Sequence, residues 1–367
     1  MDFLPLSKWI PNLKKPLVIA GPCSAESEEQ VLATANELKQ IEDVRILRAG
    51  VWKPRTRPNT FEGMGEEALP WLEKAKAQTG LLTSVEVATS KHVELALKYN
   101  VDILWIGART SANPFAVQEI ADAIKGTNIP VMVKNPINAD LALWMGAIER
   151  IAGAGINKIA AIHRGFSTYE QNKYRNRPLW RIPIALKDQL KGIPVICDPS
   201  HIAGARAYIA EVSQKAMDAD MDGLMIETHI NPNVAMSDAK QQVTPERLNE
   251  ILRGLNLRTE YSSNRSFEGE LDNLREKIDR VDKELLEFLS IRMKIVEDIG
   301  AAKSRNNVTP LQIHRMNEMM QKRLDVAESL GLPLQYIKEL YDIIHAESVK
   351  KQTSVMNTFA SSTEDKS

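Results

Sequence analysis

The chain has 367 residues, of which 43% are hydrophobic and 26% charged, and its formal net charge is −1. This composition is typical of a soluble globular protein and argues against a general nucleic-acid binder, which is usually strongly basic. No apolar run reaches the length of a membrane span, and the first residues lack the apolar core of a signal peptide. The two cysteines, Cys23 and Cys197, make no disulfide framework, so we expect a cytoplasmic protein.

From residue 16 to about 255, strand and helix patterns alternate. The eight expected strands are short apolar runs: Leu17–Ala20, Arg45–Leu47, Leu81–Val87, Ile103–Ile106, Val131–Val133, Lys158–Ile162, Val195–Cys197 and Leu224–Ile226. The expected helices include Glu66–Gln78, His92–Tyr99, Pro114–Lys125, Asp140–Ala154 and Ala203–Met217. Most of the runs lack alternation, which is typical of strands covered on both faces. The pattern predicts an α/β fold, a (β/α)8 TIM barrel, with a doubly wound open sheet as the alternative.

Reactive residue types follow each expected strand. The endings are Gly21-Pro22-Cys23-Ser24, the segment from Arg48 to Thr56, Glu86, Gly107-Ala108-Arg109-Thr110, Lys134-Asn135-Pro136, His163-Arg164-Gly165, Asp198-Pro199-Ser200-His201 and Glu227-Thr228-His229. Active sites of TIM barrels lie at the C-terminal ends of the strands. Eight such endings in a row therefore predict a functional site at that end of the barrel.

Six cations belong to these strand ends, namely Arg48, Lys53, Arg55, Arg109, Lys134 and Arg164. A solvated basic loop is an equal alternative for the three cations between residues 48 and 55 alone. Mutual repulsion, however, makes a cluster of six costly unless anions are bound. The cluster therefore predicts one or two substrates that carry two phosphates and a carboxylate.

A metal site is expected beside the cations, formed by Cys23, His201, Glu227 and Asp238. The first three follow strands one, seven and eight, which adjoin when a barrel closes. Thiolate, imidazole and carboxylate ligands suit manganese, iron, cobalt or zinc, any of which can polarise a carbonyl. The alternatives are an inert buried thiol for Cys23 and a hydrogen-bonded loop histidine for His201.

Residues 16–255 closely resemble 3-deoxy-D-arabino-heptulosonate 7-phosphate (DAHP) synthases, of the short subgroup called type I-beta. The matching segments are AGPCS (20–24), RAGVWKPRT (48–56), IGART (106–110), VKNP (133–136), HRG (163–165), DPSH (198–201), ET (227–228) and SDAKQ (237–241). The KPRT segment distinguishes this family from related barrels, such as 3-deoxy-octulosonate 8-phosphate synthase, which carry a different sequence there. The resemblance implies condensation of phosphoenolpyruvate with erythrose 4-phosphate, the first step of the shikimate pathway.

The resemblance also implies a role for each matching position. The metal is held by Cys23, His201, Glu227 and Asp238; phosphoenolpyruvate by Arg48, Arg109, Lys134 and Arg164; and the phosphate end of erythrose 4-phosphate by Arg55 and Thr56, with Lys53 between the two substrates. C3 of phosphoenolpyruvate attacks the aldehyde, water adds at C2 and phosphate leaves.

After a polar segment at 256–268, which we interpret as a linker, the sequence becomes long, charged and helical. Apolar residues recur at steps of three, four and seven between 270 and about 304, and two shorter helices are expected at about 311–329 and 334–352. Such unequal helices cannot close a compact monomeric core, so the long helix is expected to pack against a partner chain. The tail from 354 to 367 is expected to be disordered.

Polar residues interrupt the apolar stripes of these helices. They are Arg275, Arg292, Lys303, Arg315, Ser348 and Gln352. Any single arginine can extend to water from a stripe edge, but four cations and two polar groups on facing stripes predict a pocket for a small dianion.

Residues 270–352 resemble the all-helical AroQ-type chorismate mutases, through LREKID at 274–279, the Arg292–Lys303 spacing and the ESVKKQ end. The resemblance implies rearrangement of chorismate to prephenate without a cofactor, in a homo-oligomer, a dimer or a dimer of dimers. Arg275 would reach into the partner's pocket and bind carboxylates with Arg292 and Arg315; Lys303 and Gln352 would hydrogen-bond the ether oxygen, and Ser348 would contact the substrate. Two positions depart from the family, because Gln312 and Met316 stand where acidic residues are often found. Those family residues lie near the substrate hydroxyl or help to position the site, so we expect their absence to affect efficiency more than the class of ligand.

The expected organisation is therefore a barrel at 1–255, a linker at 256–268, a mutase domain at 269–353 and a disordered tail. One alternative makes the helical domain a chorismate or prephenate sensor that inhibits the barrel allosterically. A purely structural dimerisation bundle would leave the polar stripe residues unexplained.

Overall fold

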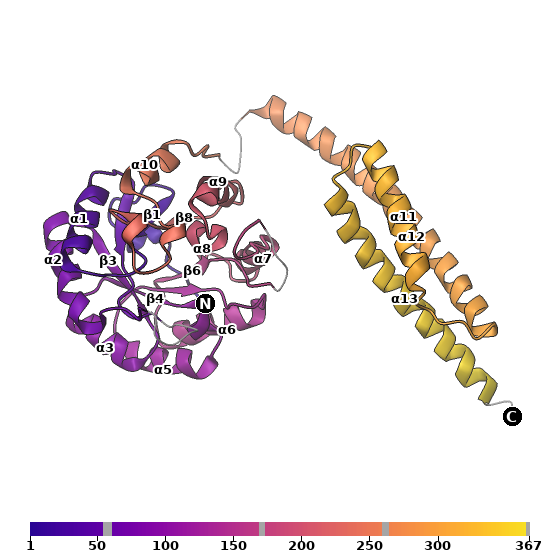
Figure 1. Cartoon of the computed structure of the whole chain (residues 1–367), viewed down its shortest axis with the longest axis horizontal. Coiled ribbons are helices and arrows are strands. Elements are labelled where there is room, and N and C mark those ends of the chain that lie inside the picture. The colour runs from indigo at the N-terminus through magenta and orange to yellow at the C-terminus, as the bar shows by residue number, and fades with distance from the viewer. Residues whose placement is uncertain (54–60, 169–172, 259–263, 365–367) are drawn as a thin grey trace. The chain divides into compact units, whose positions relative to one another are not determined.

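The computed structural model describes residues 1–53, 61–168, 173–258 and 264–364. The chain divides into two compact units, Met1–Glu260 and Tyr261–Ser367 (Figure 1). Arg55 and Thr56, two of the expected substrate-binding residues, lie outside the described residues.

The first unit is a closed barrel of eight parallel strands in chain order. The strands are β1 (Leu17–Gly21), β2 (Val44–Arg48), β3 (Leu82–Val87), β4 (Ile103–Ile106), β5 (Val131–Lys134), β6 (Ile159–His163), β7 (Val195–Cys197) and β8 (Gly223–Glu227). Pairing of β1 with β8, from Leu17 opposite Gly223 to Gly21 opposite Glu227, closes the barrel. The predicted TIM barrel is confirmed, and the open sheet is excluded.

Helices surround the barrel (Figure 1). They are α1 (Glu28–Lys39), α2 (Leu69–Thr79), α3 (Ser90–Lys98), α5 (Pro114–Ile124), α6 (Leu141–Gly153), α7 (Arg181–Gln189), α9 (Ile209–Asp218) and α10 (Pro245–Arg253), with the short α4 (Ala108–Ser111) and α8 (Pro199–Ala203) at strand ends. The helix expected at 203–217 is wrong as one element. Gly204, with φ 67°, ends α8 in the left-handed conformation, and α9 starts at Ile209.

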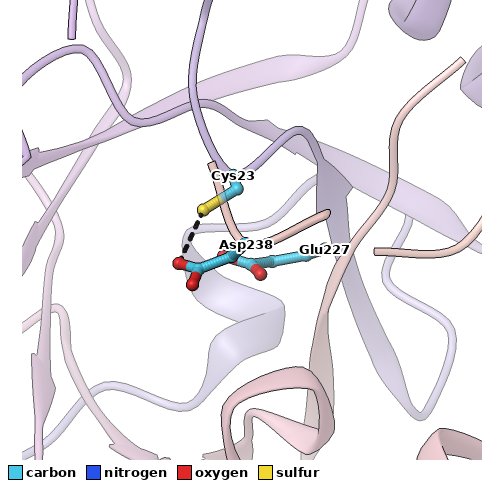
Figure 2. A group of neighbouring side chains, drawn as sticks. All are labelled: Cys23, Glu227 and Asp238. Atoms are coloured by element: carbon cyan, nitrogen blue, oxygen red, sulfur yellow. Dashed lines mark hydrogen bonds between the residues drawn. The ribbon is translucent and has the colours of Figure 1, made fainter. Parts of the chain in front are cut away.

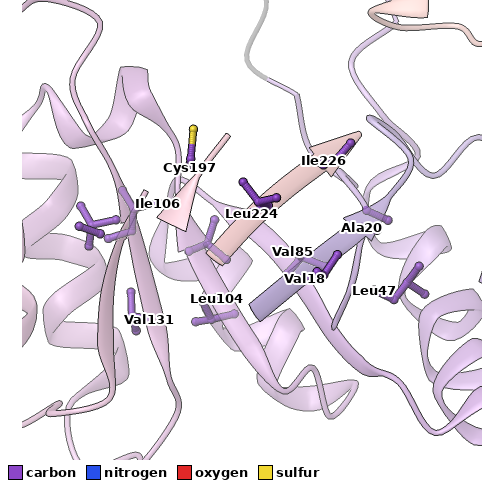
Figure 3. Packing of buried hydrophobic residues seen from close by; sticks show 14 of the residues in the cluster. Val18, Ala20, Leu47, Val85, Leu104, Ile106, Val131, Cys197, Leu224 and Ile226 are labelled. Carbon is purple, nitrogen blue, oxygen red and sulfur yellow. The ribbon is translucent and has the colours of Figure 1, made fainter. Parts of the chain in front are cut away.

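Apolar side chains fill both faces of the barrel wall. Outward-facing residues such as Val18, Leu47 and Leu224 pack beneath the helices (Figure 3). Inward-facing residues such as Ile19 and Trp105 fill the barrel interior. Because both faces are buried, the strand sequences do not alternate between apolar and polar residues, as the sequence pattern indicated.

Gly21 ends β1 and starts the loop that carries Cys23. Its φ is +144°, and a Cβ built there would lie 2.1 Å from the carbonyl oxygen of Arg48. A side chain at this position would clash with the backbone, so only glycine allows β1 and β2 to approach this closely where their loops enter the site.

The second unit contains α11 (Arg265–Arg305), α12 (Ile313–Ser329) and α13 (Leu334–Glu364). Helix α11 starts within the predicted linker, where the Asn264 side chain accepts hydrogen bonds from the backbone N–H groups of Ser266 and Phe267. Helix α13 continues to Glu364, past position 354, where the expected tail begins. No glycine or proline occurs between 334 and 364 to end the helix. Among the described helices, none is both long and apolar enough to cross a membrane.

Candidate functional site

Cys23, Glu227 and Asp238 lie together at the C-terminal end of the barrel (Figure 2). They come from the loop after β1, the end of β8 and the loop after β8. One ligand atom from each lies within 4.8 Å of the other two, and the Cys23 thiol donates to Asp238 Oδ2 at 3.2 Å. Closure of β1 against β8 therefore brings together three of the four expected metal ligands.

His201, the fourth expected ligand, lies at the edge of this group. Its Nε2 atom is 3.8 Å from Glu227 Oε1, but it is not a member of the three-residue group. The Asp198 carboxylate contacts its other ring nitrogen, Nδ1, at 2.8 Å. A proton on Nδ1 would leave the Nε2 lone pair free toward Glu227, which is the tautomer that a metal ligand needs.

Two loops far apart in the sequence are joined beside the group. The Gln242 side chain accepts from the backbone N–H of Cys23 at 2.9 Å and donates to the Ser237 carbonyl at 2.8 Å. The Ser24 and Ser237 hydroxyls lie 2.6 Å apart. Gln242 is fully buried. Its two hydrogen bonds therefore hold the loop of Cys23 next to the loop of Asp238. Sequence reasoning missed Gln242, whose one signal was its place directly after the SDAKQ segment.

Three of the expected cations surround the group. Arg48, which is 3% exposed, places Nη1 3.4 Å from Glu227 Oε1 and its guanidinium over the Trp105 ring. Lys53 contacts the Cys23 thiol and lies 3.5 Å from Asp238 Oδ2. Buried Lys134 pairs with Asp198 at 2.9 Å. The structure therefore brings the candidate metal ligands and three of the expected cations together at one end of the barrel.

Arg164 is also buried, and its Nη1 donates to Asn176 Oδ1 at 3.0 Å. Burial lowers the pKa of Arg164 to about 10; the attraction of Asp198 opposes this, and the charges of Arg175 and Arg109 add to it. Arg175 was not predicted, yet it donates to Asp238 Oδ1 at 3.2 Å. A bound anion would offset the repulsion among these arginines.

The protonation states depend on burial and on these charges. Burial, followed by the Glu227 charge, raises the pKa of the Cys23 thiol. Burial opposes ionisation of Glu227, but His201, Arg48 and Lys53 outweigh it and lower the pKa of that carboxyl. Burial would also neutralise Lys53, but the neighbouring acidic groups outweigh it and raise the pKa of its ammonium group.

The residues present fit a divalent transition metal. Glu227 Oε1 is buried without a hydrogen-bond partner in the described part of the chain. The thiol of Cys23 is the group that a borderline metal would bind as a thiolate. A metal cation here would coordinate this oxygen, which lies in ion-pair contact with Arg48 at 3.4 Å, and would offset the cost of ionising the thiol.

His163, which was one of the reactive strand endings, has a different environment. Its ring packs near Trp144, Phe166 and Trp180. Burial, followed by the charge of Arg164, lowers its pKa to about 3. The imidazole is therefore neutral and belongs to the aromatic layer behind the site.

In the second unit, the expected polar residues are only partly brought together. Arg292 donates to the Ser348 hydroxyl at 2.6 Å, and the buried Gln352 follows one turn later on α13. A Cβ on Gly300 would lie 3.1 Å from Gln352 Cα, so glycine at this position allows α11 to approach α13 closely. Lys303 donates to the Pro310 carbonyl at 2.7 Å.

The other two expected carboxylate-binding residues are exposed. Arg275 pairs with Asp272 at 3.2 Å, and Arg315 pairs with Glu318 at 2.9 Å. Sequence reasoning missed Arg323, Tyr341 and His345, which line a pocket together with Arg292 and Met316. Their signal was helical spacing: residues 316, 319, 320 and 323 share one face of α12, and 341, 345 and 348 share one face of α13.

Two family models match the chain. The DAHP synthetase I family matches residues 10–262, and chorismate mutase type II matches residues 274–353. These matches confirm both resemblances found from the sequence motifs and place each in its own structural unit.

Individual proteins similar to this chain match its barrel. A phospho-2-dehydro-3-deoxyheptonate aldolase of Thermotoga maritima is 32% identical over 236 residues, which cover 64% of this chain and 68% of the relative. A 2-dehydro-3-deoxyphosphooctonate aldolase of Legionella pneumophila is 30% identical over 267 residues, which cover 66% of this chain and 92% of the relative.

A crystal structure of the Thermotoga maritima DAHP synthase matches with a TM-score of 0.58 and 30% identity, covering 64% of this chain and 66% of that one. The chain thus spans about two thirds of the length of that structure. The chain belongs to the DAHP synthetase I family and joins a barrel of that enzyme family to a helical domain of the chorismate mutase type II family.

Proposed function

We propose that the barrel condenses phosphoenolpyruvate with erythrose 4-phosphate to give DAHP and phosphate. The observation that carries this proposal is the buried group of Cys23, Glu227 and Asp238 beside Arg48 and Lys53. With His201, the three residues would hold a divalent transition metal, manganese, iron, cobalt or zinc. When bound, the metal would supply polarisation of the aldehyde carbonyl.

The chain's own residues supply binding and proton transfer. Arg48, Lys134, Arg164 and Arg109 bind the phosphate and carboxylate of phosphoenolpyruvate. Lys53 remains an ammonium ion because acidic neighbours raise its pKa. We propose that it donates a proton to the aldehyde oxygen while C3 of phosphoenolpyruvate forms the new carbon–carbon bond. Water then adds at C2, and phosphate leaves.

A second candidate is condensation with a five-carbon sugar phosphate, because octulosonate aldolases also match this chain. The KPRT segment at 53–56 favours the four-carbon sugar. We expect kcat/KM to be about 10²-fold higher with erythrose 4-phosphate than with arabinose 5-phosphate, because a site fitted to the shorter sugar rejects one additional hydroxymethylene (CHOH) unit. Phosphate release measured with each aldose decides this, and equal or reversed preference would favour the octulosonate reaction.

For the helical domain we propose chorismate mutase activity. Arg292, Arg275 and Arg315 would bind the two carboxylates, and Ser348 would contact the substrate. Lys303 and Gln352 would stabilise the ether oxygen as its bond breaks. The Gln352 side chain is buried, and its amide Nε2 would be the donor to this ether oxygen. The sensor alternative uses the same pocket for allosteric inhibition of the barrel.

The free thiols of Cys23 and Cys197 suit the cytoplasmic location that we propose.

The helical domain is proposed to form a dimer, or a dimer of dimers, through α11. A long apolar stripe on this helix is exposed: Leu274, Ile278, Val281, Leu285, Phe288, Ile295 and Ile299 are each at least 41% exposed. In the described part of this unit, only Val296, Ala327 and Ile337 are buried apolar residues. So large an unpaired stripe marks an interaction surface, and its heptad spacing suits a second copy of the same helix.

We expect Leu285→Asp to shift the protein toward monomers, because a carboxylate would be buried in the middle of the proposed interface. Sedimentation over a range of concentrations measures this shift. Lys283→Asp, two residues away and on the opposite side of α11, is the matched control and should leave assembly unchanged. A wild-type chain that sediments as a monomer at all concentrations contradicts the proposal.

A further inference from the structure

A small pocket lies between the three helices of the second unit. Arg292 reaches it from α11, and Tyr341 and His345 reach it from α13. Met316, Met319, Met320 and Arg323 line it from α12. Two of these polar residues, Arg323 and His345, have no role in the proposed mutase site, although they share a pocket with Arg292, which does.

His345 lies one helical turn before Ser348 on the same face of α13. Three residues correspond to a rise of about 4.5 Å, so a ligand that contacts Ser348 can also reach His345. The Nε2 atom of His345 is buried and has no hydrogen-bond partner among the described residues. A buried polar atom normally has a hydrogen-bond partner, so this Nε2 atom is available to a ligand in the pocket.

The charges of the pocket indicate what kind of ligand it binds. Burial lowers the pKa of Arg292, and the nearby charge of Arg323 lowers it further. Arg323 stacks on the Tyr341 ring and donates to the Met319 carbonyl. Within the described ranges, neither guanidinium forms an ion pair with a carboxylate, although Arg275 and Arg315 both do. Two unneutralised guanidinium groups at one pocket suit an anion.

We propose that His345 is a substrate-binding residue of the mutase pocket, where its Nε2 atom hydrogen-bonds the ring hydroxyl of chorismate beside the apolar side chain of Met316. This inference rests on the proposed mutase function. It explains how a pocket with methionine at position 316 can still offer a polar group to the hydroxyl. Arg323, across the pocket, contributes to anion binding.

Three variants of the full-length protein test the assignment. His345→Leu removes the polar atom, His345→Gln keeps a hydrogen-bonding group at similar reach, and His314→Leu removes an exposed histidine of α12 as the control. We expect His345→Leu to lower kcat/KM for chorismate about tenfold, and His345→Gln to stay within about threefold of wild type. Prephenate binding by calorimetry should weaken in parallel, while the thermal unfolding midpoints stay together.

A rescue experiment separates substrate contact from a structural role. Adding Met316→Glu to His345→Leu should recover most of the lost kcat/KM, because it returns a polar group to the same pocket. Equal losses in His345→Leu and His345→Gln, without recovery by Met316→Glu, would overturn the assignment. So would a His345→Leu rate equal to that of His314→Leu. If the wild-type chain neither binds nor consumes chorismate, the mutase proposal itself fails, and the role of His345 fails with it.

Discussion

Cys23→Ala is expected to lower the kcat/KM of DAHP formation about 10³-fold. The thiol comes from the loop after β1 and faces Asp238 at 3.2 Å, so it is a central member of the proposed ligand group. Loss of a ligand weakens metal binding and removes several kcal/mol of carbonyl polarisation, and each 1.36 kcal/mol is a factor of ten. Phosphoenolpyruvate consumption, together with the metal content of the purified protein, measures the effect.

Cys197→Ala is the matched control for this experiment. Cys197 is also a fully buried free thiol, but it points into the apolar layer outside the barrel (Figure 3). Its loss should leave the synthase rate unchanged and cost only about 1 kcal/mol of stability. Chelation of the wild-type enzyme should stop the reaction, and one of the four candidate metals should restore it. A synthase rate that survives both chelation and Cys23→Ala contradicts the metal site.

The barrel and the centre of its site could be predicted because strand ends share one location in this fold. Once eight strand–helix units were counted, residues as distant as Cys23 and Glu227 were expected to be neighbours. Gln242 could not be predicted, because its role depends on a loop conformation that places it against the backbone of Cys23, 219 residues away in the sequence. Arg175 was missed for the same reason: it reaches Asp238 across the barrel mouth from a segment without a pattern.

In the helical domain, the spacing of apolar residues predicted the helices but not every residue of the pocket. The resemblance implied that Arg292 and Ser348 share one substrate pocket, and the structure joins them by a hydrogen bond between α11 and α13. Arg323 and His345 line one pocket only because α12 and α13 pack together, and no local pattern distinguishes them from solvated residues. The Ser- and Thr-rich composition after residue 353 favours disorder, whereas the absence of glycine and proline there is compatible with the continuation of α13.

Arg292→Ala is expected to lower kcat/KM for chorismate rearrangement about 10²- to 10³-fold. Its guanidinium is half-buried, contacts Ser348 and lies in a pocket with a second cation, so a bound carboxylate would lose a charged hydrogen bond in a desolvated place. Consumption of chorismate by the full-length protein measures this loss. Lys294→Ala, exposed on the same helix, is the control and should retain the wild-type rate.

The same variant separates the two readings of the helical domain. A working mutase loses chorismate consumption in Arg292→Ala, while the barrel continues to condense phosphoenolpyruvate, because the two proposed sites use separate residues. A sensor would show no consumption even in the wild-type chain, yet prephenate would slow the synthase, and Arg292→Ala would relieve that inhibition. An enzyme that does both would lose turnover and inhibition together, because a single pocket then binds the ligand for both effects. If prephenate leaves the synthase rate unchanged at every substrate concentration, the proposed allosteric coupling is wrong. Catalysis would then be the remaining explanation for the polar residues on the helix stripes.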